Sequence, residues 1–153
     1  MPEADRRRLD ASDLVLTFGA LRDRIAASGL GAPLLALRST PTAPTRRALG
    51  SIPPAARVVA VSRYADCSPA LAVGVRRYAP QAGTVTATDL DRGDLTAALA
   101  ACDVLVMSAG AEAARTLAPA RAARIDYCPV PDPEDVDRLV RPRLKSGRTA
   151  PTA

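Results

Sequence analysis

The stretch Val58-Val59-Ala60-Val61-Ser62 decides the fold, because a nearly continuous apolar run suits a strand that is buried on both faces. Similar runs lie on either side of it, at 13–17 and at 104–108. Shorter runs at 34–37, 84–88 and 124–127 complete the series, and helix-like stretches separate them. The sequence therefore predicts an α/β fold, with a doubly wound and mainly parallel Rossmann-like sheet of about six strands.

The segments between the runs predict the domain organisation. We expect residues 1–9 to form a polar leader, 10–145 one α/β domain, and 146–153 a disordered tail. Ser68 is predicted to be the N-cap of a helix that begins at Pro69 and runs through about Tyr78, and Asp132 is predicted to cap another helix in the same way, with Pro133 after it. Residues 39–54 hold several prolines, which interrupt regular structure, and form a possible internal boundary.

The composition excludes several kinds of chemistry. The chain has 153 residues, of which 48% are hydrophobic, and it has no histidine. Ser-His-Asp and Cys-His machinery and histidine-containing zinc sites are therefore excluded. Three cysteines without framework spacing fit a reducing cytosol, and no signal peptide or membrane-spanning stretch is visible. The sequence predicts a cytoplasmic protein that has no metal, no cofactor and no contact with a membrane.

The net charge of +5 leaves two interpretations open. All but one of the 21 basic residues are arginine, which is typical of a GC-rich bacterial genome. Many of them stand near the two ends of the chain, where they are either simply solvated or form a surface that attracts phosphate.

Three strand-to-helix junctions carry the candidate site. We expect them to meet at the carboxyl edge of the sheet, where ligands bind in such folds. Their small hydroxyls and backbone N–H groups favour an anion. Arg63 adds a bidentate donor, and Phe18 and Tyr64 would cover an apolar part of the ligand. The predicted ligand-binding residues are Thr17, Phe18, Gly19, Ser62, Arg63, Tyr64, Ser108, Ala109 and Gly110. Simple helix capping remains the alternative for Ser108, and a surface salt bridge for Arg63.

No known phosphate fingerprint accompanies these junctions. The chain lacks both GxGxxG and GxxxxGK[ST], so a classical dinucleotide or nucleoside triphosphate site is not expected. Cys67 and Cys128 both follow predicted strands, and two thiols facing each other would suit a racemase-like reaction. Small packing residues are the better interpretation of both cysteines, and no catalytic residue is assigned.

A resemblance to a known family adds to this interpretation. It rests on 58–64, on the helix 72–80, on 102–108 and on 125–127 with Pro131-Asp132-Pro133. Together these are similar to the C-terminal, non-DNA-binding half of certain GntR-type bacterial transcription regulators. The resemblance covers roughly 10–144 and implies a lobe like those of periplasmic-binding-protein-like sensors. It also implies effector sensing and dimerisation.

The resemblance has one large departure. GntR-type regulators carry an N-terminal winged helix, and nothing before Asp13 is long enough to hold one. We therefore expect no direct DNA binding by this chain alone. The chain is interpreted either as an excised sensor domain or as a free-standing relative.

Three functions stay open on the sequence. The leading one is a non-catalytic sensor domain, forming a homodimer, for a small polar or anionic molecule. The second is a small isomerase-like or racemase-like enzyme of the same fold that uses Cys67 or Asp66. The third is an oligomerisation or interaction module without a ligand.

Overall fold

A computed structural model describes residues 3–147 of the chain and the side chains of residues 3–144. The described chain divides into two compact units. Unit 1 comprises residues 3–40 and 130–147, and unit 2 comprises residues 41–129.

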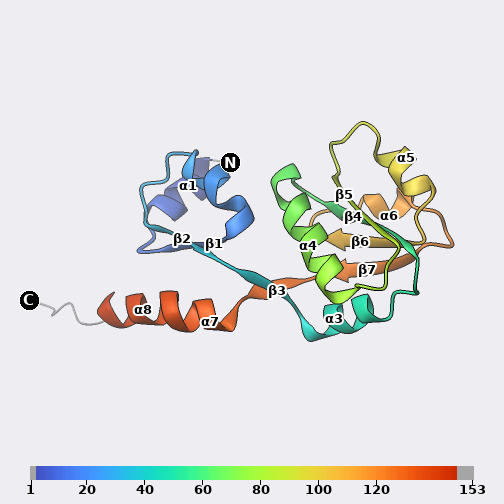
Figure 1. The fold of residues 1–153 in the computed structure, drawn as a ribbon. Coiled ribbons are helices and arrows are strands. Elements are labelled where there is room, and N and C mark those ends of the chain that lie inside the picture. The colour runs from blue at the N-terminus through green and yellow to red at the C-terminus, as the bar shows by residue number, and fades with distance from the viewer. Residues whose placement is uncertain (1–2, 148–153) are drawn as a thin grey trace, which may run out of the picture. The chain divides into compact units, whose positions relative to one another are not determined.

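Unit 2 contains a parallel sheet of four strands in the order β5-β4-β6-β7 (Figure 1). The elements of this unit are α3 (Ala43–Gly50), β4 (Arg57–Ser62), η2 (Ala65–Cys67), α4 (Ser68–Tyr78), β5 (Thr84–Asp89), α5 (Leu95–Ala100), β6 (Val104–Ser108), α6 (Ala114–Leu117) and β7 (Ala123–Tyr127). The central strands β4 and β6 hold the apolar runs that the sequence predicted to be buried on both faces. The α/β, Rossmann-like class is confirmed.

Helices cover both faces of this sheet and create two separate cores. Beneath α3 and α4, the cluster of buried side chains includes Leu49, Val75, Val58 and Val106. Beneath α5 and α6, Leu99 packs with alternate residues of the same strands, such as Val61 and Leu105. The period of two along each strand therefore divides its apolar residues between the two cores.

Arg57 and Asp103 fasten the edge of the sheet at which β4 and β6 begin. The carboxylate of Asp103 accepts hydrogen bonds from the Arg57 backbone N–H at 2.9 Å and from Nε at 3.0 Å. A third bond, from Nη2, measures 2.9 Å. The Arg57 hydrogen bonds hold the pKa of Asp103 well below its usual range.

Unit 1 is smaller, and its sheet has two parallel strands, β1 and β2. Its elements are α1 (Glu3–Asp10), β1 (Val15–Phe18), η1 (Gly19–Leu21), α2 (Arg22–Ala26), β2 (Leu34–Leu37), α7 (Pro133–Asp135), η3 (Val136–Val140) and α8 (Arg141–Gly147). Among its described residues the buried apolar side chains are few: Val15, Ala32, Leu37 and Val140.

The last three elements of unit 1 run on from one another. The segment η3 is a π-helix, in which the Arg141 N–H donates to the carbonyl of Val136, five residues before it. In an α-helix, the ring of Pro142 would clash with the carbonyl four residues earlier. The wider turn accommodates that proline, and the helix continues to Gly147.

Two short strands carry the chain between the units. β3 (Ser39–Pro41) and β8 (Pro129–Pro131) form a two-stranded sheet of their own, and the division between the units falls within both. The Asp132 N–H bonds to the carbonyl of Arg38 at one end of this pair, and the Thr42 N–H bonds to the carbonyl of Cys128 at the other.

The observed pairing of the strands differs from the predicted sheet. All six predicted strands are present, but they do not form one sheet of about six, because among residues 3–147 β1 and β2 pair only with each other. The chain crosses from unit 1 to unit 2 after Thr40, inside the segment 39–54 that was expected to hold a boundary. It crosses back to unit 1 at Val130, and this second boundary was not predicted. The expected leader is largely the helix α1. Of the expected tail 146–153, residues 146 and 147 belong to α8, and the rest lie outside the described residues.

Candidate functional site

The candidate site lies where β4 and β6 end side by side in unit 2. From β4 the chain first forms β5 on one side and then returns to form β6 on the other. The neighbours β4 and β6 therefore mark the topological switch point, the place where ligands bind in open α/β sheets. Ser62 and Arg63 stand at the end of β4, and Ser108 ends β6.

These two junctions touch each other. The Arg63 N–H donates to Oγ of Ser108 at 3.3 Å. Gly110 has a φ of +82°, and a Cβ at this position would lie 3.3 Å from both Cβ and Cγ of Arg63. The glycine thus meets two requirements, a left-handed backbone and room for the stem of the arginine.

The Arg63 guanidinium is held loosely. Its side chain is 43% exposed, and Nη1 lies 3.5 Å from Oδ1 of Asp91, whose side chain is 81% exposed. The guanidinium also stands 5.7 Å from the ring centre of Tyr64. Exposed ion pairs of this length contribute little, and a guanidinium has five N–H donors. Arg63 can therefore bind a further acceptor without giving up a strong internal contact.

Ser62 and Ser68 form buried polar contacts beside the junction that follows β4. The Ser62 side chain is fully buried, its Oγ donates to the Tyr64 carbonyl at 2.5 Å, and Oγ of Ser68 lies 2.8 Å away. Oγ of Ser68 in turn bonds to the carbonyl of Thr88 at 2.9 Å. Ser68 is the first residue of α4 and not its cap, and Cys67 holds the cap position without a side-chain hydrogen bond that caps the helix. In this arrangement neither hydroxyl is open to a ligand.

In the loop that follows β6, a carboxylate of the protein itself already accepts hydrogen bonds from the backbone N–H groups. Oε1 of Glu112 accepts the N–H of Gly110 at 3.0 Å. Hydrogen bonds from the N–H groups of Glu112 itself and of Gly110 lower the pKa of this carboxyl. Ala109 is exposed beside them. Glu112 was not among the predicted site residues, and its carboxylate takes the position expected for an anion at this loop.

The first predicted junction belongs to the other unit. Thr17, Phe18 and Gly19 stand at the end of β1 in unit 1, where Oγ1 of Thr17 bonds to the carbonyl of Phe18 at 3.4 Å. The expectation that all three junctions share one sheet edge is therefore wrong. β1 pairs with β2 in a sheet of their own, and the β4 and β6 junctions belong to the four-stranded sheet of unit 2.

The cysteines are spread over unit 2. Cys67 is half-buried, Cys102 is buried, and Cys128 is exposed. Cys67 follows β4, and Cys128 follows β7. Because β6 lies between these two strands, β4 and β7 are about 10 Å apart. Burial raises the pKa of the Cys102 thiol, and the negative charge of the nearby Asp103 raises it further. Among residues 3–147 no group of three His, Cys, Asp or Glu side chains could hold a metal ion.

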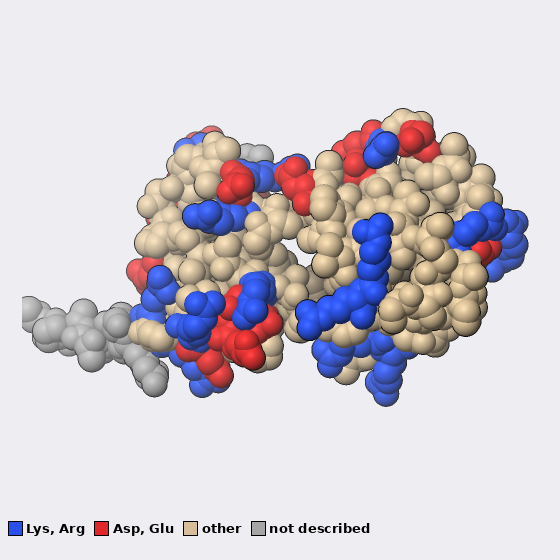
Figure 2. All heavy atoms as spheres, viewed as in Figure 1, with Lys and Arg blue, Asp and Glu red and all other residues tan. Residues whose placement is uncertain are grey.

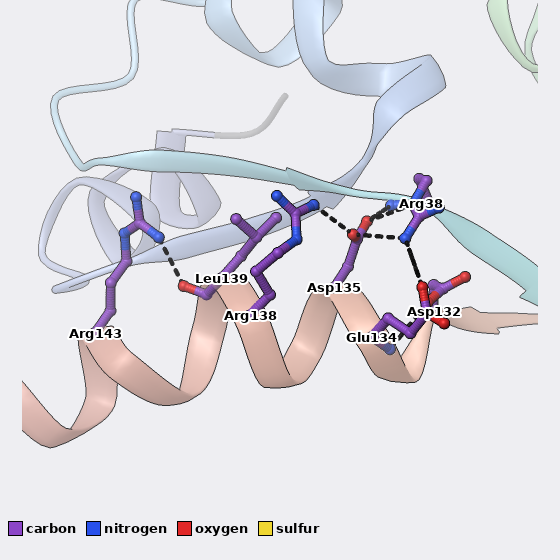
Figure 3. Close-up of polar contacts among 7 residues, drawn as sticks. All are labelled: Arg38, Asp132, Glu134, Asp135, Arg138, Leu139 and Arg143. Atoms are coloured by element: carbon purple, nitrogen blue, oxygen red, sulfur yellow. Dashed lines mark hydrogen bonds and ion pairs between the residues drawn. The ribbon is translucent and has the colours of Figure 1, made fainter.

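Asp135 forms a network in unit 1 that the sequence analysis did not foresee (Figure 3). Its carboxylate is 3% exposed and accepts bonds from the Arg38 backbone N–H at 2.8 Å, from Arg38 Nη2 at 3.0 Å and from Arg138 Nη2 at 2.9 Å. Asp132 caps the same helix, as predicted, through a 2.9 Å bond from the Glu134 N–H. The Arg38 hydrogen bonds hold the pKa of Asp135 well below its usual range.

Comparisons with family models, with curated proteins and with solved structures find no significant match to this chain. Within the described residues, no helix is long and apolar enough to cross a membrane.

Proposed function

We propose that this chain is a small-molecule sensor domain that binds a polar or anionic effector at the carboxyl ends of β4 and β6. The contact of Arg63 with Gly110 and Ser108 at the switch point carries this proposal. It gathers a loosely held guanidinium, a hydroxyl and a glycine-containing loop in one place. The resemblance to the effector-binding half of GntR-type regulators supports the same role and adds dimerisation to the proposal.

Glu112 suggests how an anionic effector would bind. Its carboxylate neutralises the N–H groups of the β6–α6 loop as an anionic ligand would. A bound anion must therefore displace Glu112, after which Arg63 and the freed N–H groups share the new charge. A neutral polar molecule would bind more weakly, because it brings no negative charge to replace that of the displaced Glu112 carboxylate.

A thermal-shift screen against a library of cytosolic metabolites tests the proposal. A ligand at about 100 times its Kd adds about 2.7 kcal/mol of stability, which corresponds to several degrees in Tm. The shift should be lost in Arg63→Ala and kept in Arg92→Ala, which removes an exposed arginine paired with Asp94. For an anionic hit, Glu112→Gln should raise the affinity. A well-folded protein that shows no shift with any metabolite contradicts the proposal, as does equal binding by Arg63→Ala.

A further inference from the structure

The four-stranded sheet of unit 2 has two outer strands, β5 and β7, and their outer edges differ. Beside β7, the hydroxyl of Thr45 in α3 donates to the Asp126 carbonyl at 3.3 Å and accepts the Cys128 N–H at 3.3 Å. Helix α3 thus covers the β7 edge. Beside β5, no strand among residues 3–147 pairs with the outer side. The β5 edge is therefore the open one.

The pairing of β5 with β4 decides which backbone groups point outward. The Leu90 N–H, just after β5, donates to the carbonyl of Ser62 in β4. Alternate residues of a strand turn their N–H and C=O groups to the same neighbour, so the even-numbered residues of β5 face β4. The N–H and C=O groups of Val85, Ala87 and Asp89 consequently point away from the sheet.

Few contacts reach these outward groups. Arg76 Nη2 donates to the Val85 carbonyl at 2.8 Å, and the Arg92 N–H lies 3.4 Å from the Asp89 carbonyl. The outward N–H groups have no partner among residues 3–147. The strand carries no charged side chain before its last residue and no proline. It therefore lacks the features that usually block a free edge from pairing with another strand.

One side of α4 lies next to this edge and carries Pro69, Val73 and Arg76. Successive helical residues are about 100° apart, so these three side chains lie within about 60° of one another around the helix. The bond from Arg76 to β5 places this side at the β5 edge, whereas Gly74, on the opposite side, meets Tyr127 of β7. Val73 is 64% exposed there.

Opposite charges stand at the two ends of the β5 edge. Arg76 lies beside its first outward residue, and Asp89 is its last. Figure 2 shows blue side chains over α4 and red ones over the loop that follows β5. Val85 pairs in register with Val58 of the core beneath α3 and α4, so Asp89, four residues on, is on the face that α4 covers. Neither Arg76 nor Asp89 makes an ion pair within the described part of the chain.

We propose that the β5 edge is the interface of a homodimer, in which two β5 strands pair antiparallel about a two-fold axis at Ala87. The proposal assigns an interface to the dimer that is part of the proposed function, and it rests on that part. In this register Val85 lies opposite Asp89 of the partner subunit, with the two Cα atoms about 5.5 Å apart. Arg76 then leaves the Val85 carbonyl to the partner's backbone N–H and pairs with the carboxylate of the partner's Asp89.

The spacing of the helices fits a second copy of this chain. Helix α4 contacts both β4 and β5, so its axis lies about half a strand spacing inside β5. With strands about 4.8 Å apart, the two α4 helices of the dimer stand about 10 Å from each other. Packed helices have axes about 8–10 Å apart, so the exposed Val73 of each copy is covered in the seam between them. An unrelated strand would supply neither this second helix nor the matching carboxylate.

Sedimentation velocity of the full chain over a range of concentrations tests the interface. We expect a dimer at about 0.1 mM protein. Arg76→Glu and Asp89→Arg should each weaken dimerisation by at least about tenfold, because each replaces two attractive pairs with two repulsive ones. An equal mixture of the two variants should form a heterodimer about as stable as the unmodified dimer, since both pairs then join opposite charges.

Arg77→Glu is the matched control. Arg77 is exposed on the same helix but is turned about 100° from Arg76. Its substitution makes the same change in charge and should alter the dimer Kd by less than about threefold. Val73→Asp tests the seam between the helices independently and should weaken dimerisation by at least about tenfold. Circular dichroism and thermal unfolding establish that the variants fold.

The outcomes separate this interface from the proposed function. A chain that stays monomeric at about 1 mM overturns both the interface and dimerisation, whereas the effector site is decided by the thermal-shift screen. A dimer that resists Arg76→Glu or Val73→Asp overturns the β5 interface alone. So do an equal loss in Arg77→Glu and a mixture of folded Arg76→Glu and Asp89→Arg chains that stays monomeric.

Discussion

The phenol ring of Tyr127 lies directly against Cα of Gly74, in the middle of α4. A Cβ at position 74 would collide with the phenol oxygen and lie 3.0 Å from Cζ. Tyr127 is 8% exposed and belongs to the core beneath α3 and α4. In a free helix, Gly→Ala stabilises by roughly 0.5–1 kcal/mol. Here we expect Gly74→Ala to lower the free energy of unfolding by about 2 kcal/mol, as overpacking does.

A double-mutant cycle assigns this loss to the tyrosine. Tyr127→Phe removes the phenol oxygen, which is the atom closest to the added methyl group. The cost of Gly74→Ala should therefore fall by about 1 kcal/mol in the Tyr127→Phe background. Urea unfolding of the four proteins measures the coupling, and simple additivity would contradict the packing argument.

Thr88 carries a buried hydroxyl that makes no hydrogen bond with any residue from 3 to 147. Thr88 is 3% exposed, and it pairs in register with Val61, which belongs to the core beneath α5 and α6. An unpaired buried polar group costs free energy that an apolar group of the same shape does not. We expect Thr88→Val to raise the free energy of unfolding by about 1 kcal/mol.

Thr86→Val is the matched control, because Thr86 is exposed on the same side of the same strand. Its effect should stay within about 0.5 kcal/mol of zero. A destabilising Thr88→Val would instead mean that this hydroxyl has a partner, such as a water molecule.

Asp135 makes the stability of the protein depend on pH. The bonds from Arg38 and Arg138 lower its pKa in the folded chain. Its contribution is therefore complete above the pKa of an unfolded aspartate, about 4, and is lost as the pH falls further. We expect Asp135→Asn to lower the urea midpoint at pH 7, and the gap to the unmodified protein to narrow steadily below about pH 4.

Asp137→Asn serves as the comparison for this experiment. Asp137 stands on the same helix and pairs with Arg141, but its side chain is 63% exposed. Its substitution should leave the pH profile nearly unchanged, since exposed pairs contribute little. A constant gap between Asp135→Asn and the unmodified protein down to about pH 2 would contradict the assigned role of the carboxylate.

Ala55 adopts a left-handed conformation, with a φ of +61°. Its backbone packs against Gly83, where a Cβ would lie 2.6 Å from the Ala55 carbonyl oxygen. Glycine removes the steric cost at position 55 but loses more entropy on folding. We expect Ala55→Gly to stabilise by about 0.5 kcal/mol, whereas Ala97→Gly in the exposed part of α5 should destabilise by a similar amount. Thermal unfolding distinguishes the two signs.

Much of the fold of unit 2 can be predicted from the sequence. Apolar runs locate β4 and β6, since strands covered on both faces need apolar residues at every position. The bounds of β6 match the prediction at both ends, and α4 ends at Tyr78 as predicted but begins one residue early, at Ser68. Ser68 nevertheless has a different role, because its hydroxyl found partners across the sheet that local sequence does not reveal.

The two connecting strands and the partition of the chain could not be predicted in this way. β3 and β8 are three residues each and end in prolines, and local pattern reads proline as a break. Asp135 looked like an ordinary acid near a helix start, whereas its burial depends on Arg38, which is 97 residues away in the chain. Of the candidate site, the sequence placed Arg63, Ser108 and Gly110 together correctly, but not Thr17, which lies in the other unit.

The division of the chain also sets an order of events during synthesis. Unit 2 is one continuous stretch, whereas unit 1 is assembled from residues 3–40 and 130–147. The Arg38 side chain emerges from the ribosome long before Asp135 exists. The first part of unit 1, whose buried apolar residues include Val15 and Leu37, must therefore wait for the rest of its unit until unit 2 and the final helix have been made. For that interval the nascent chain depends on chaperones or on the early folding of unit 2 to avoid aggregation.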